Sequence, residues 1–270
     1  MSQTVDSMMP TLPGRKSEVR QRQITERVVA EGSCTAQELA NEFGVSIMTI
    51  HRDLDLLQQR GIVRKFHGGV TAQPSGVFEA RMSTRMTTNV TEKESIGRKA
   101  LDFVQPGMSV LLDDSTSVLH MISGFPDRAP LHIGTTFLTG LTKLAPVTEA
   151  SGITAIGIGG RYDALHDSFV GAQAVAQVEA MRWDAVFMST SAVSEQVAHH
   201  QEDHIMALKK AMLASATERY LLADHSKLGH VALHKFAALS EFDCIITDQK
   251  ADRAILNLWD ELGIRYEIAN

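Results

Sequence analysis

The chain has 270 residues, of which 44% are hydrophobic and 21% are charged, and it contains 19 Gly and 7 Pro. This composition excludes disordered, collagen-like and coiled-coil proteins. At about 150 residues per domain, the length predicts two globular domains. The net charge of −6 argues against a nucleic-acid-binding protein, because the phosphate backbone of DNA attracts positive charge.

The negative average conceals an uneven distribution of charge. Between Arg15 and Thr71, nine Lys and Arg residues stand against seven Asp and Glu residues, so this segment carries a net charge of +2 and the rest of the chain −8. A local basic surface on an acidic protein is therefore compatible with DNA binding by the N-terminal segment.

Neither the apolar residues nor the cysteines indicate a membrane or secreted protein. No apolar run reaches the about 18 residues of a membrane span, and the N-terminal segment lacks the apolar stretch of a secretory signal. Cys34 and Cys244 lie 210 positions apart and are expected to be small apolar residues rather than a disulfide or a metal site. We expect a cytoplasmic protein without membrane contact.

The N-terminal segment begins with a tail and a helix. Residues 1–14 contain Pro and Gly and are expected to be disordered. Within residues 17–30, Arg20, Ile24 and Val28 recur at four-residue steps, which predicts an amphipathic helix. Gly32 is expected to end this helix.

Two shorter helices are predicted next. Thr35 lies three residues before Glu38, the spacing of a capping box, so a helix is expected from about residue 36 to 43, where Gly44 ends it. Ser46 is expected to cap a third helix. The apolar residues that keep the helical period of this third helix up to Gly61 are Ile47, Ile50, Leu54 and Leu57.

Residues 62–70 enclose the turn Gly68-Gly69 and predict a small β-hairpin, or wing. Two short helices joined by a tight turn have helix-turn-helix geometry. On the third helix, Arg52 can donate a bidentate pair to guanine, whereas Thr49 and His51 can reach base edges or phosphates. The other outward positions are Met48, which can contact a thymine methyl group, and Asp55. A three-helix bundle with a solvated polar face remains the alternative.

Residues 20–69 resemble the winged helix-turn-helix of DeoR-type bacterial repressors. The resemblance rests on the spacing of the segment, on the run Thr-Ile-x-Arg-Asp-Leu-x-x-Leu that begins at Thr49, and on the His-Gly-Gly that begins at His67. It implies double-stranded operator DNA as the partner. One departure is His51, where the family commonly has an arginine. The residues then expected to contact DNA are Thr35, Ser46, Met48, Thr49, His51, Arg52, Arg64, Lys65 and His67.

Residues 73–90 are rich in Ser, Thr, Pro, Gly and Met without a clear period and are expected to form a linker. From residue 91 onward, short apolar runs alternate with helical patterns, which predicts βαβ units around a largely parallel sheet. The expected strands are 109–112, 131–134, 153–158, 185–188, 220–223, 244–247 and 266–268. Helices are expected, for example, over 92–103, 171–181, 204–216 and 251–262.

Ligands of such sheets bind beyond the carboxyl ends of the strands, so the residues after each apolar run carry most weight. Asp113-Asp114-Ser115-Thr116-Ser117 precedes a helical pattern and could hold a phosphate at a helix N-terminus, although the bare pattern favours an ordinary helix cap. Gly159-Gly160 allows a close approach of ligand or backbone, and a simple turn explains it equally well. Lys227 could clamp an anion or simply lie on the surface.

Residues 91–270 resemble the sensor domain of the same family, which shares its sheet with ribose-5-phosphate isomerase. The resemblance implies a phosphorylated sugar or a related anionic metabolite as effector. Departures from the family pattern are Ser115, residues 134–137 and residues 189–195. The residues then expected to bind the effector are Asp113, Ser115, Thr116, Ser117, Thr135, Gly159, Gly160, Gly171, Asp203, Lys209 and Lys227.

Parts of the sequence are also compatible with a catalytic site or a metal site. An isomerase would need a carboxylate base and an acid, for which Asp113, Asp203, His204 and Lys227 could serve, but no contiguous catalytic signature is present. A metal could bind the cluster His199, His200, Asp203 and His204 if an early helix start put His200 and His204 on one face. A solvated or pocket-lining loop is preferred there, and no metal or cofactor is expected.

The sequence therefore predicts an α/β protein with a winged helix-turn-helix head and an effector-sensing domain built on a largely parallel sheet. The expected domains are a tail (1–14), the head (15–72), a linker (73–90) and the sensor (91–270). We expect a non-enzymatic, cytoplasmic repressor of a carbohydrate operon that forms a dimer or tetramer. The alternatives are a sugar-phosphate isomerase-like enzyme with an adaptor head, and a transcriptional activator of the same architecture.

Overall fold

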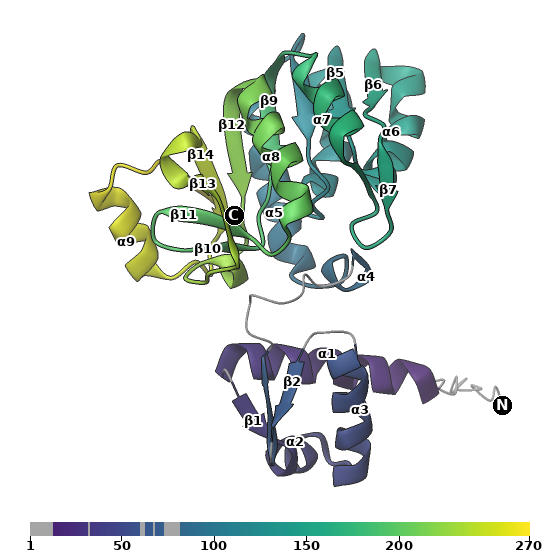
Figure 1. The fold of residues 1–270 in the computed structure, drawn as a ribbon, viewed down its shortest axis with the longest axis vertical. Helices are drawn as coiled ribbons and strands as arrows, with labels where there is room; N and C mark the ends of the chain where they lie inside the picture. The colour runs from purple at the N-terminus through teal and green to yellow at the C-terminus, as the bar shows by residue number, and fades with distance from the viewer. Residues whose placement is uncertain (1–12, 32, 60–62, 67, 73–81) are drawn as a thin grey trace, which may run out of the picture. The chain divides into compact units, whose positions relative to one another are not determined.

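The computed structural model describes residues 13–31, 33–59, 63–66, 68–72 and 82–270. The chain divides into two compact units, residues 1–74 and 75–270, whose elements are labelled in Figure 1. The expected tail lies outside the described residues except for Pro13 and Gly14, which form the start of the first helix instead. Proline is common at the first position of a helix because a backbone N–H group there would have no acceptor within the helix, so its absence in proline costs nothing.

The first unit combines three helices with a small antiparallel sheet. Its strands pair in the order β1-β3-β2, and β1 is a strand that the sequence did not predict. The helices are α1 (Pro13–Glu31), α2 (Ala36–Phe43) and α3 (Ile47–Gln59), and the strands are β1 (Ser33–Thr35), β2 (Val63–Phe66) and β3 (Gly69–Ala72).

Local hydrogen bonds set the ends of the short helices. The Thr35 hydroxyl accepts the Glu38 N–H at 3.1 Å and the Glu38 carboxylate accepts the Thr35 N–H at 2.7 Å, so the capping box of α2 is confirmed. Gly44 ends α2 with φ +61°, a conformation that suits glycine. Ser46 Oγ accepts the Thr49 N–H at 3.2 Å and caps α3.

The core of the first unit contains the apolar residues that the helical period singles out. Ile24, Ile50 and Leu54 are completely buried. Ile47, however, is 41% exposed, so its expected place in the apolar stripe is wrong. Ile47 is the first residue of α3, so no preceding turn of the helix covers its side chain. The buried stripe of α3 begins at Ile50 instead.

The second unit is built on a seven-stranded sheet with the order β15-β14-β12-β9-β4-β5-β6. Every pair of neighbours in this sheet is parallel, which confirms the expected architecture. All seven strands fall where apolar runs predicted them. They are β4 (Ser109–Leu112), β5 (Leu131–Thr135), β6 (Ile153–Gly157), β9 (Trp183–Met188), β12 (Ala216–Leu222), β14 (Cys244–Asp248) and β15 (Tyr266–Ala269).

Helices cover both faces of this sheet (Figure 1). Successive residues of β4 point to opposite faces, so Leu111 packs with α7, α8 and α9, whereas Val110 and Leu112 pack with α5, α6 and η2. The helices are α5 (Val90–Ala100), η1 (Leu101–Phe103), η2 (Val118–Arg128), α6 (Leu138–Ser151), α7 (Ala172–Glu179), α8 (Asp203–Ser215) and α9 (Arg253–Glu261).

Shorter elements, which the sequence did not predict, lie around the sheet. The hairpin β7–β8 and the three-stranded sheet β10-β11-β13 are antiparallel. His200 ends β11, where it pairs with His234, so it does not share a helix face with His204. The remaining elements are α4 (Met82–Arg85), β7 (Arg161–Asp163), β8 (Ser168–Val170), β10 (Ala192–Val193), β11 (Val197–His200), η3 (His225–Lys227), β13 (His234–Ala238) and η4 (Leu239–Glu241).

Among the described residues, no helix is both long and apolar enough to cross a membrane.

Candidate functional site

The exposed face of α3 consists of Met48, Thr49, His51 and Arg52. Met48 is 60% exposed, Arg52 is exposed, and Thr49 and His51 are partly exposed. Among the described residues, Arg52 has no carboxylate partner, so its guanidinium can donate to a ligand. This α3 face offers donors, an imidazole and a methyl group, the chemistry that reads base edges in a major groove.

A buried carboxylate holds the opposite side of α3. Asp53 is 3% exposed, and it accepts the Arg20 Nε at 2.6 Å and the Gln21 amide at 2.8 Å, both from α1. Sequence reasoning placed Arg20 on an apolar stripe and missed this bond. Of the adjacent residues Arg52 and Asp53 on α3, the arginine therefore faces outward, and the aspartate faces inward and anchors α3 to α1.

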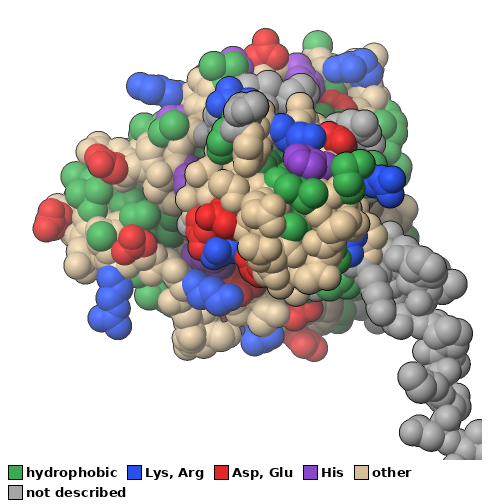
Figure 2. All heavy atoms as spheres, turned by 90° about the horizontal axis from the view of Figure 1, so that it is seen from below, with side chains coloured by type: hydrophobic (Ala, Val, Ile, Leu, Met, Phe, Trp, Pro, Cys, Tyr) green, Lys and Arg blue, Asp and Glu red, His purple; other side chains and the backbone are tan. Residues whose placement is uncertain are grey.

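The wing contributes basic residues with different surroundings. Lys65 Nζ lies 2.6 Å from Asp55 Oδ1 on α3, whereas Arg64 is exposed. Thr35 and Ser46 are exposed at the N-termini of α2 and α3. His67 lies outside the described residues. In the space-filling view, Lys and Arg side chains lie among acidic and hydrophobic ones rather than forming one basic patch (Figure 2).

In the second unit, the ion pair between Asp113 and Lys209 lies at the carboxyl ends of the central strands. Asp113, directly after β4, is 1% exposed, and its Oδ2 accepts the Lys209 ammonium at 2.7 Å and the Ser189 N–H at 2.8 Å. Its Oδ1 accepts the Ser115 N–H at 3.0 Å. Asp113 is therefore bound on all sides and fixes the loop over residues 113–117.

Both lysines expected at the site meet at Ser189, which directly follows β9. Lys209 Nζ donates to the Ser189 carbonyl at 3.0 Å, and Lys227 Nζ donates to the Ser189 hydroxyl at 2.7 Å. Ser189 itself was not among the residues that the sequence predicted to bind an effector. The family resemblance marked residues 189–195 as a departure but gave Ser189 no role of its own, and the parallel order of β4 and β9 brings it between the lysines. We call Asp113, Asp114, Ser117, Ser189, Lys209 and Lys227 the strand-end cluster.

Two polar atoms of the strand-end cluster lack partners. Asp114 Oδ2 and Ser117 Oγ are buried without a hydrogen-bond partner among the described residues. Burial raises the pKa of Asp114, although the Lys209 charge acts in the opposite direction. Buried polar groups without partners are costly, so these two atoms are suited to bind a polar ligand. Thr116, beside Ser117, is 5% exposed.

Further charged groups surround this edge. Lys93 on α5 is 5% exposed and donates to the Arg85 and Thr88 carbonyl oxygens at 2.7 and 2.8 Å. Burial and the nearby Lys227 charge lower the pKa of Lys93 to about 8. Burial disfavours the charged form of Asp224, but the charge of Lys227 keeps the pKa of Asp224 below its ordinary value. Lys93, Lys227 and Asp224 therefore influence one another's charge near the carboxyl ends of the strands.

Other expected effector residues lie outside the hydrogen bonds of the strand-end cluster. Thr135, at the end of β5, is 2% exposed and accepts the Phe137 N–H at 3.1 Å. The Gly159 backbone exchanges two hydrogen bonds with Gln177, and a Cβ on Gly160 would lie 2.7 Å from the Val170 carbonyl oxygen. Gly171 precedes α7 with φ +95°. Asp203 is exposed at the first residue of α8.

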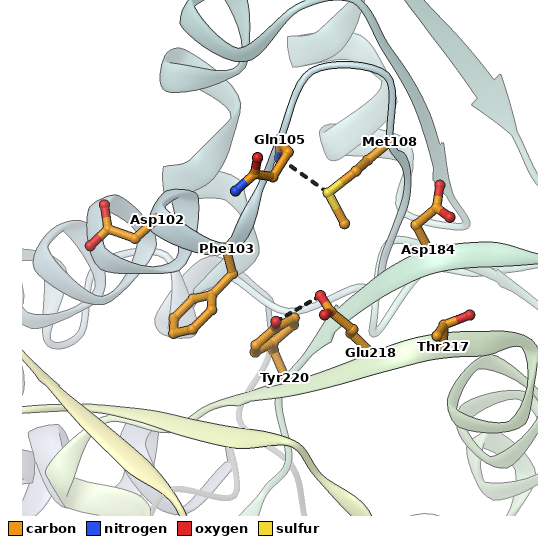
Figure 3. A pocket seen from close by; sticks show the side chains of 8 residues that line it. All are labelled: Asp102, Phe103, Gln105, Met108, Asp184, Thr217, Glu218 and Tyr220. Atoms are coloured by element: carbon orange, nitrogen blue, oxygen red, sulfur yellow. Dashed lines mark hydrogen bonds between the residues drawn. The ribbon is translucent and has the colours of Figure 1, made fainter.

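The described cavities lie away from the strand-end cluster. One, of about 480 Å³, is at the opposite edge of the sheet, where Tyr220 donates to Glu218 at 2.9 Å (Figure 3). Another, of about 750 Å³, is lined by residues of α5, η2 and α6. Neither is lined by a residue expected to bind the effector. The strand-end cluster is closed by its own hydrogen bonds, and a ligand would have to replace the Lys227–Ser189 bond.

Two known domain families match this chain. The family model of the DeoR-like helix-turn-helix domain matches residues 20–75, and that of the DeoR C terminal sensor domain matches residues 88–249. The two matches fall one in each compact unit, apart from the last residue of the first match.

Three similar proteins are regulators by name. The HTH-type transcriptional regulator YgbI of Escherichia coli (strain K12) is 32% identical over 243 residues, covering 88% of this chain and 94% of the relative. The HTH-type transcriptional repressor GlcR of Bacillus subtilis (strain 168) is 28% identical, covering 88% of each. The lactose phosphotransferase system repressor of Staphylococcus aureus (strain N315) is 26% identical, covering 86% and 92%.

Among solved structures, ribose 5-phosphate isomerase A from Methanocaldococcus jannaschii aligns with a TM-score of 0.38 and 15% identity over 52% of this chain and 55% of the isomerase. A similarity of this size says nothing about activity.

Proposed function

Because this chain belongs to the DeoR family of transcriptional regulators, we propose that it is a DNA-binding repressor of a carbohydrate operon. A phosphorylated sugar or a related anionic metabolite releases it from its operator. The observation that carries this proposal is the combination, in one chain, of the exposed α3 face with a buried strand-end cluster that holds two lysines. The relatives named as repressors, one of them of the lactose phosphotransferase system, support the carbohydrate assignment.

In the proposed complex, α3 lies in the major groove of the operator. Arg52 donates to a guanine, Thr49 and His51 reach base edges or phosphates, and Met48 contacts a thymine methyl group. The backbone contacts come from the wing and from the helix N-termini, through Thr35, Ser46, Arg64, Lys65 and His67. The small size of the head supports a dimer or tetramer that reads repeated half-sites.

The proposed effector binds at the strand-end cluster through its anionic group. Lys227 and the hydroxyls of Thr116 and Ser117 are the donors, and charge-assisted hydrogen bonds of this kind contribute about 1.5–3 kcal/mol each. The partnerless Ser117 hydroxyl supports a ligand at this place. Lys209 is held by Asp113 and Ser189, and we assign it mainly to shaping the loop over residues 113–117.

We also propose that the chain is not an enzyme. One candidate carboxylate base, Asp113, already accepts three hydrogen bonds from protein groups, so its oxygens are occupied within the fold. The regulator names of the relatives support the same conclusion. Turnover of an aldose phosphate to a ketose phosphate by the purified chain, lost in Asp113→Asn, would contradict it.

The function can be tested without knowing the operator. Duplexes enriched from a random pool by the full chain give the binding sequence, and fluorescence anisotropy then measures release by sugar phosphates, with the unphosphorylated sugars as controls. We expect one enriched motif, built from repeated half-sites, and release by a phosphorylated compound only. Enrichment of no motif would overturn DNA recognition. A motif that no phosphorylated metabolite releases would overturn the effector assignment alone.

A further inference from the structure

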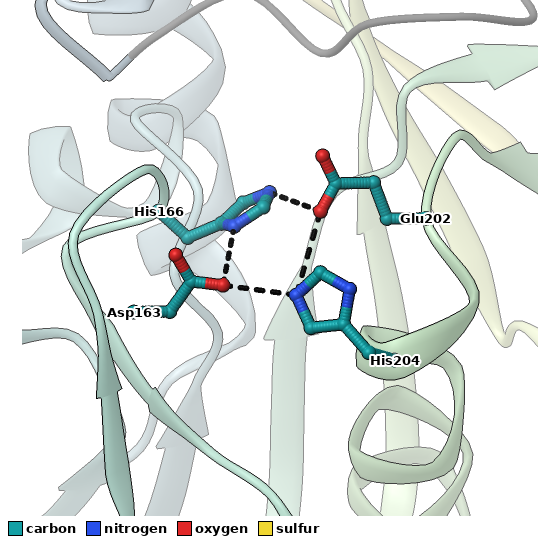
Figure 4. A group of neighbouring side chains, drawn as sticks. All are labelled: Asp163, His166, Glu202 and His204. Carbon is teal, nitrogen blue, oxygen red and sulfur yellow. Dashed lines mark hydrogen bonds and ion pairs between the residues drawn. The ribbon is translucent and has the colours of Figure 1, made fainter.

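Four potential metal ligands from two distant parts of the chain meet beside α8 (Figure 4). Asp163 ends β7 and His166 lies in the following turn, whereas Glu202 directly precedes α8 and His204 is its second residue. One ligand atom from each of the four lies within 4.8 Å of the other three. We call these four residues the histidine–carboxylate group.

Several distances within the histidine–carboxylate group are close to those between ligands of one ion, and the shortest is a hydrogen-bond distance. His204 Nε2 lies 2.9 Å from Asp163 Oδ2 and 3.4 Å from Glu202 Oε2. His166 Nδ1 lies 3.3 Å from Asp163 Oδ2, and the other ring nitrogen, Nε2, lies 3.6 Å from Glu202 Oε2, so one of these two nitrogens would bind the ion. Nitrogen and oxygen ligands bound tetrahedrally to Zn²⁺ at about 2.0–2.2 Å stand about 3.3–3.6 Å apart.

The contacts between these four side chains need protonated imidazoles if no cation is bound. His204 Nε2 faces two carboxylate oxygens, but a ring nitrogen carries at most one proton. His166 is 1% exposed and directs one ring nitrogen at each carboxylate, so both of its nitrogens would have to be protonated. Two carboxylates with two neutral imidazoles carry a charge of −2, which one divalent cation neutralises without protonating either ring.

The surroundings also orient the ligands. Asp163 Oδ1 accepts the Leu165 N–H at 2.9 Å, which turns Oδ2 toward both histidines. Such a bond to the outer oxygen is the usual support of a metal-binding carboxylate. The side chains of Asp163 and Glu202 are 14% and 20% exposed, whereas that of His204 is 37% exposed and gives access from solvent.

We propose that Asp163, His166, Glu202 and His204 bind one divalent transition-metal ion, with Zn²⁺ the ion that best fits two imidazoles and two carboxylates. The ion fastens the β7–β8 turn to the start of α8. The sequence missed this site because only His204 belongs to the cluster His199, His200, Asp203 and His204 that it presents. His166, the most buried of the four residues, lies 38 positions before His204 in the sequence.

Calorimetric titration of the metal-stripped full chain with ZnCl₂ tests the proposal. We expect one Zn²⁺ per chain, at least tenfold weaker binding in His204→Ala and in Asp163→Asn, and unchanged binding in His132→Ala, the matched control. His132 is an exposed histidine on β5, and it controls for weak binding by the chain's 11 histidines. Equal Zn²⁺ affinity in wild type and both ligand variants would overturn the proposal.

Melting temperatures and X-ray absorption test the same site independently of calorimetry. Zn²⁺ should raise the melting temperature of wild type and of His132→Ala but not that of His204→Ala, whose half-exposed side chain can be removed without loss of folding. X-ray absorption at the zinc edge should show nitrogen and oxygen ligands. Sulfur in the zinc shell would place the ion at Cys34 or Cys244 and would overturn the proposal. A chain that binds no Zn²⁺ would mean that the group is an ion-pair network with protonated histidines.

Discussion

The Nε atom of Arg20 donates a 2.6 Å hydrogen bond to Oδ2 of Asp53, and this ion pair joins α1 to α3. The Arg20 side chain is 17% exposed and that of Asp53 is 4% exposed. Because Asp53 is adjacent to Arg52, the bond fixes the direction in which α3 presents its exposed face. A structural anchor and a residue that we propose contacts DNA thus stand side by side in the sequence.

Replacing Arg20 by Ala should destabilise the first unit by about 3 kcal/mol, the low end for breaking a buried pair, because Gln21 still donates to the carboxylate. Arg27→Ala is the matched control on the same helix. Its pairs with Glu31 and Glu42 are 39–43% exposed, so it should cost about 1 kcal/mol or less.

Urea unfolding separates the two units because Trp183 and Trp259 both belong to the second. Arg20→Ala should shift the circular dichroism transition and leave the tryptophan fluorescence transition in place. Equal effects of Arg20→Ala and Arg27→Ala on unfolding would mean that the buried pair does not hold α3.

Replacing Arg52 by Ala should weaken binding to the selected operator by about 1–3 kcal/mol and relax specificity at the base pair that it contacts. Arg64→Ala, which removes a wing charge, should instead weaken all duplexes similarly and flatten the salt dependence. Anisotropy titrations against the operator and single-base variants measure both effects. Wild-type operator affinity in Arg52→Ala would show that α3 does not read the bases.

Removing the carboxylate at Asp55 should strengthen DNA binding. In the free protein its Oδ1 holds the Lys65 ammonium at 2.6 Å, and its side chain is 56% exposed. Asp55→Ala releases Lys65 for a phosphate, so we expect a gain in affinity for every duplex and a salt slope steeper by about one. The double variant Asp55→Ala with Lys65→Ala should lose this change in slope. A gain confined to the operator would contradict this interpretation.

Much of the fold could be predicted because strands of a parallel sheet are buried on both faces and therefore appear as continuous apolar runs. Val110, Leu111 and Leu112 are all at most 1% exposed, and this run predicted β4 without error. The same signal is lacking in β7, whose three residues are Arg161, Tyr162 and Asp163. The helix α6 falls between two of the expected strands, as the alternation predicts, although Gly140 and Pro146 interrupt its own helical pattern.

The candidate sites were predictable only where a single loop supplies the residues. The loop over residues 113–117 is recognisable because polar residues follow an apolar run directly. The role of Ser189 and the histidine–carboxylate group are not, because partners 20 or more positions apart in the chain meet only after the sheet and α8 are assembled. Arg85 lies in an expected linker, yet its carbonyl oxygen binds the buried Lys93.

Replacing Asp114 by Asn should stabilise the chain at neutral and alkaline pH. Burial raises the pKa of Asp114, so the folded state binds this proton more tightly than the unfolded state. Its contribution to stability is complete below the ordinary carboxyl pKa and is lost as the pH rises through the folded pKa. The amide carries no charge and avoids this loss. Melting temperatures from pH 4 to 9 should diverge upward for Asp114→Asn, and parallel curves would contradict the buried charge.

Replacing Lys227 by Ala should weaken the releasing effector by about 1.5–3 kcal/mol, the contribution of a charge-assisted hydrogen bond, and Thr116→Ala should weaken it less. Both variants should bind operator like wild type, because neither residue belongs to the first unit. Lys250→Ala, which removes a lysine 66% exposed beside Glu92, is the matched control and should leave effector affinity unchanged.

Linkage adds a second, independent requirement to the effector experiment. An effector that lowers operator affinity by a given factor must itself bind the operator complex more weakly by the same factor. Calorimetry of the effector with and without operator measures that factor directly, and anisotropy measures the reciprocal one. Agreement of the two factors in wild type is the expected outcome, and a fixed, subsaturating effector concentration should lower the operator affinity of Lys227→Ala less than that of wild type. Unchanged effector affinity in Lys227→Ala and Thr116→Ala would move the binding site away from the strand-end cluster, whereas unequal factors in wild type would mean that release and binding occur at different sites.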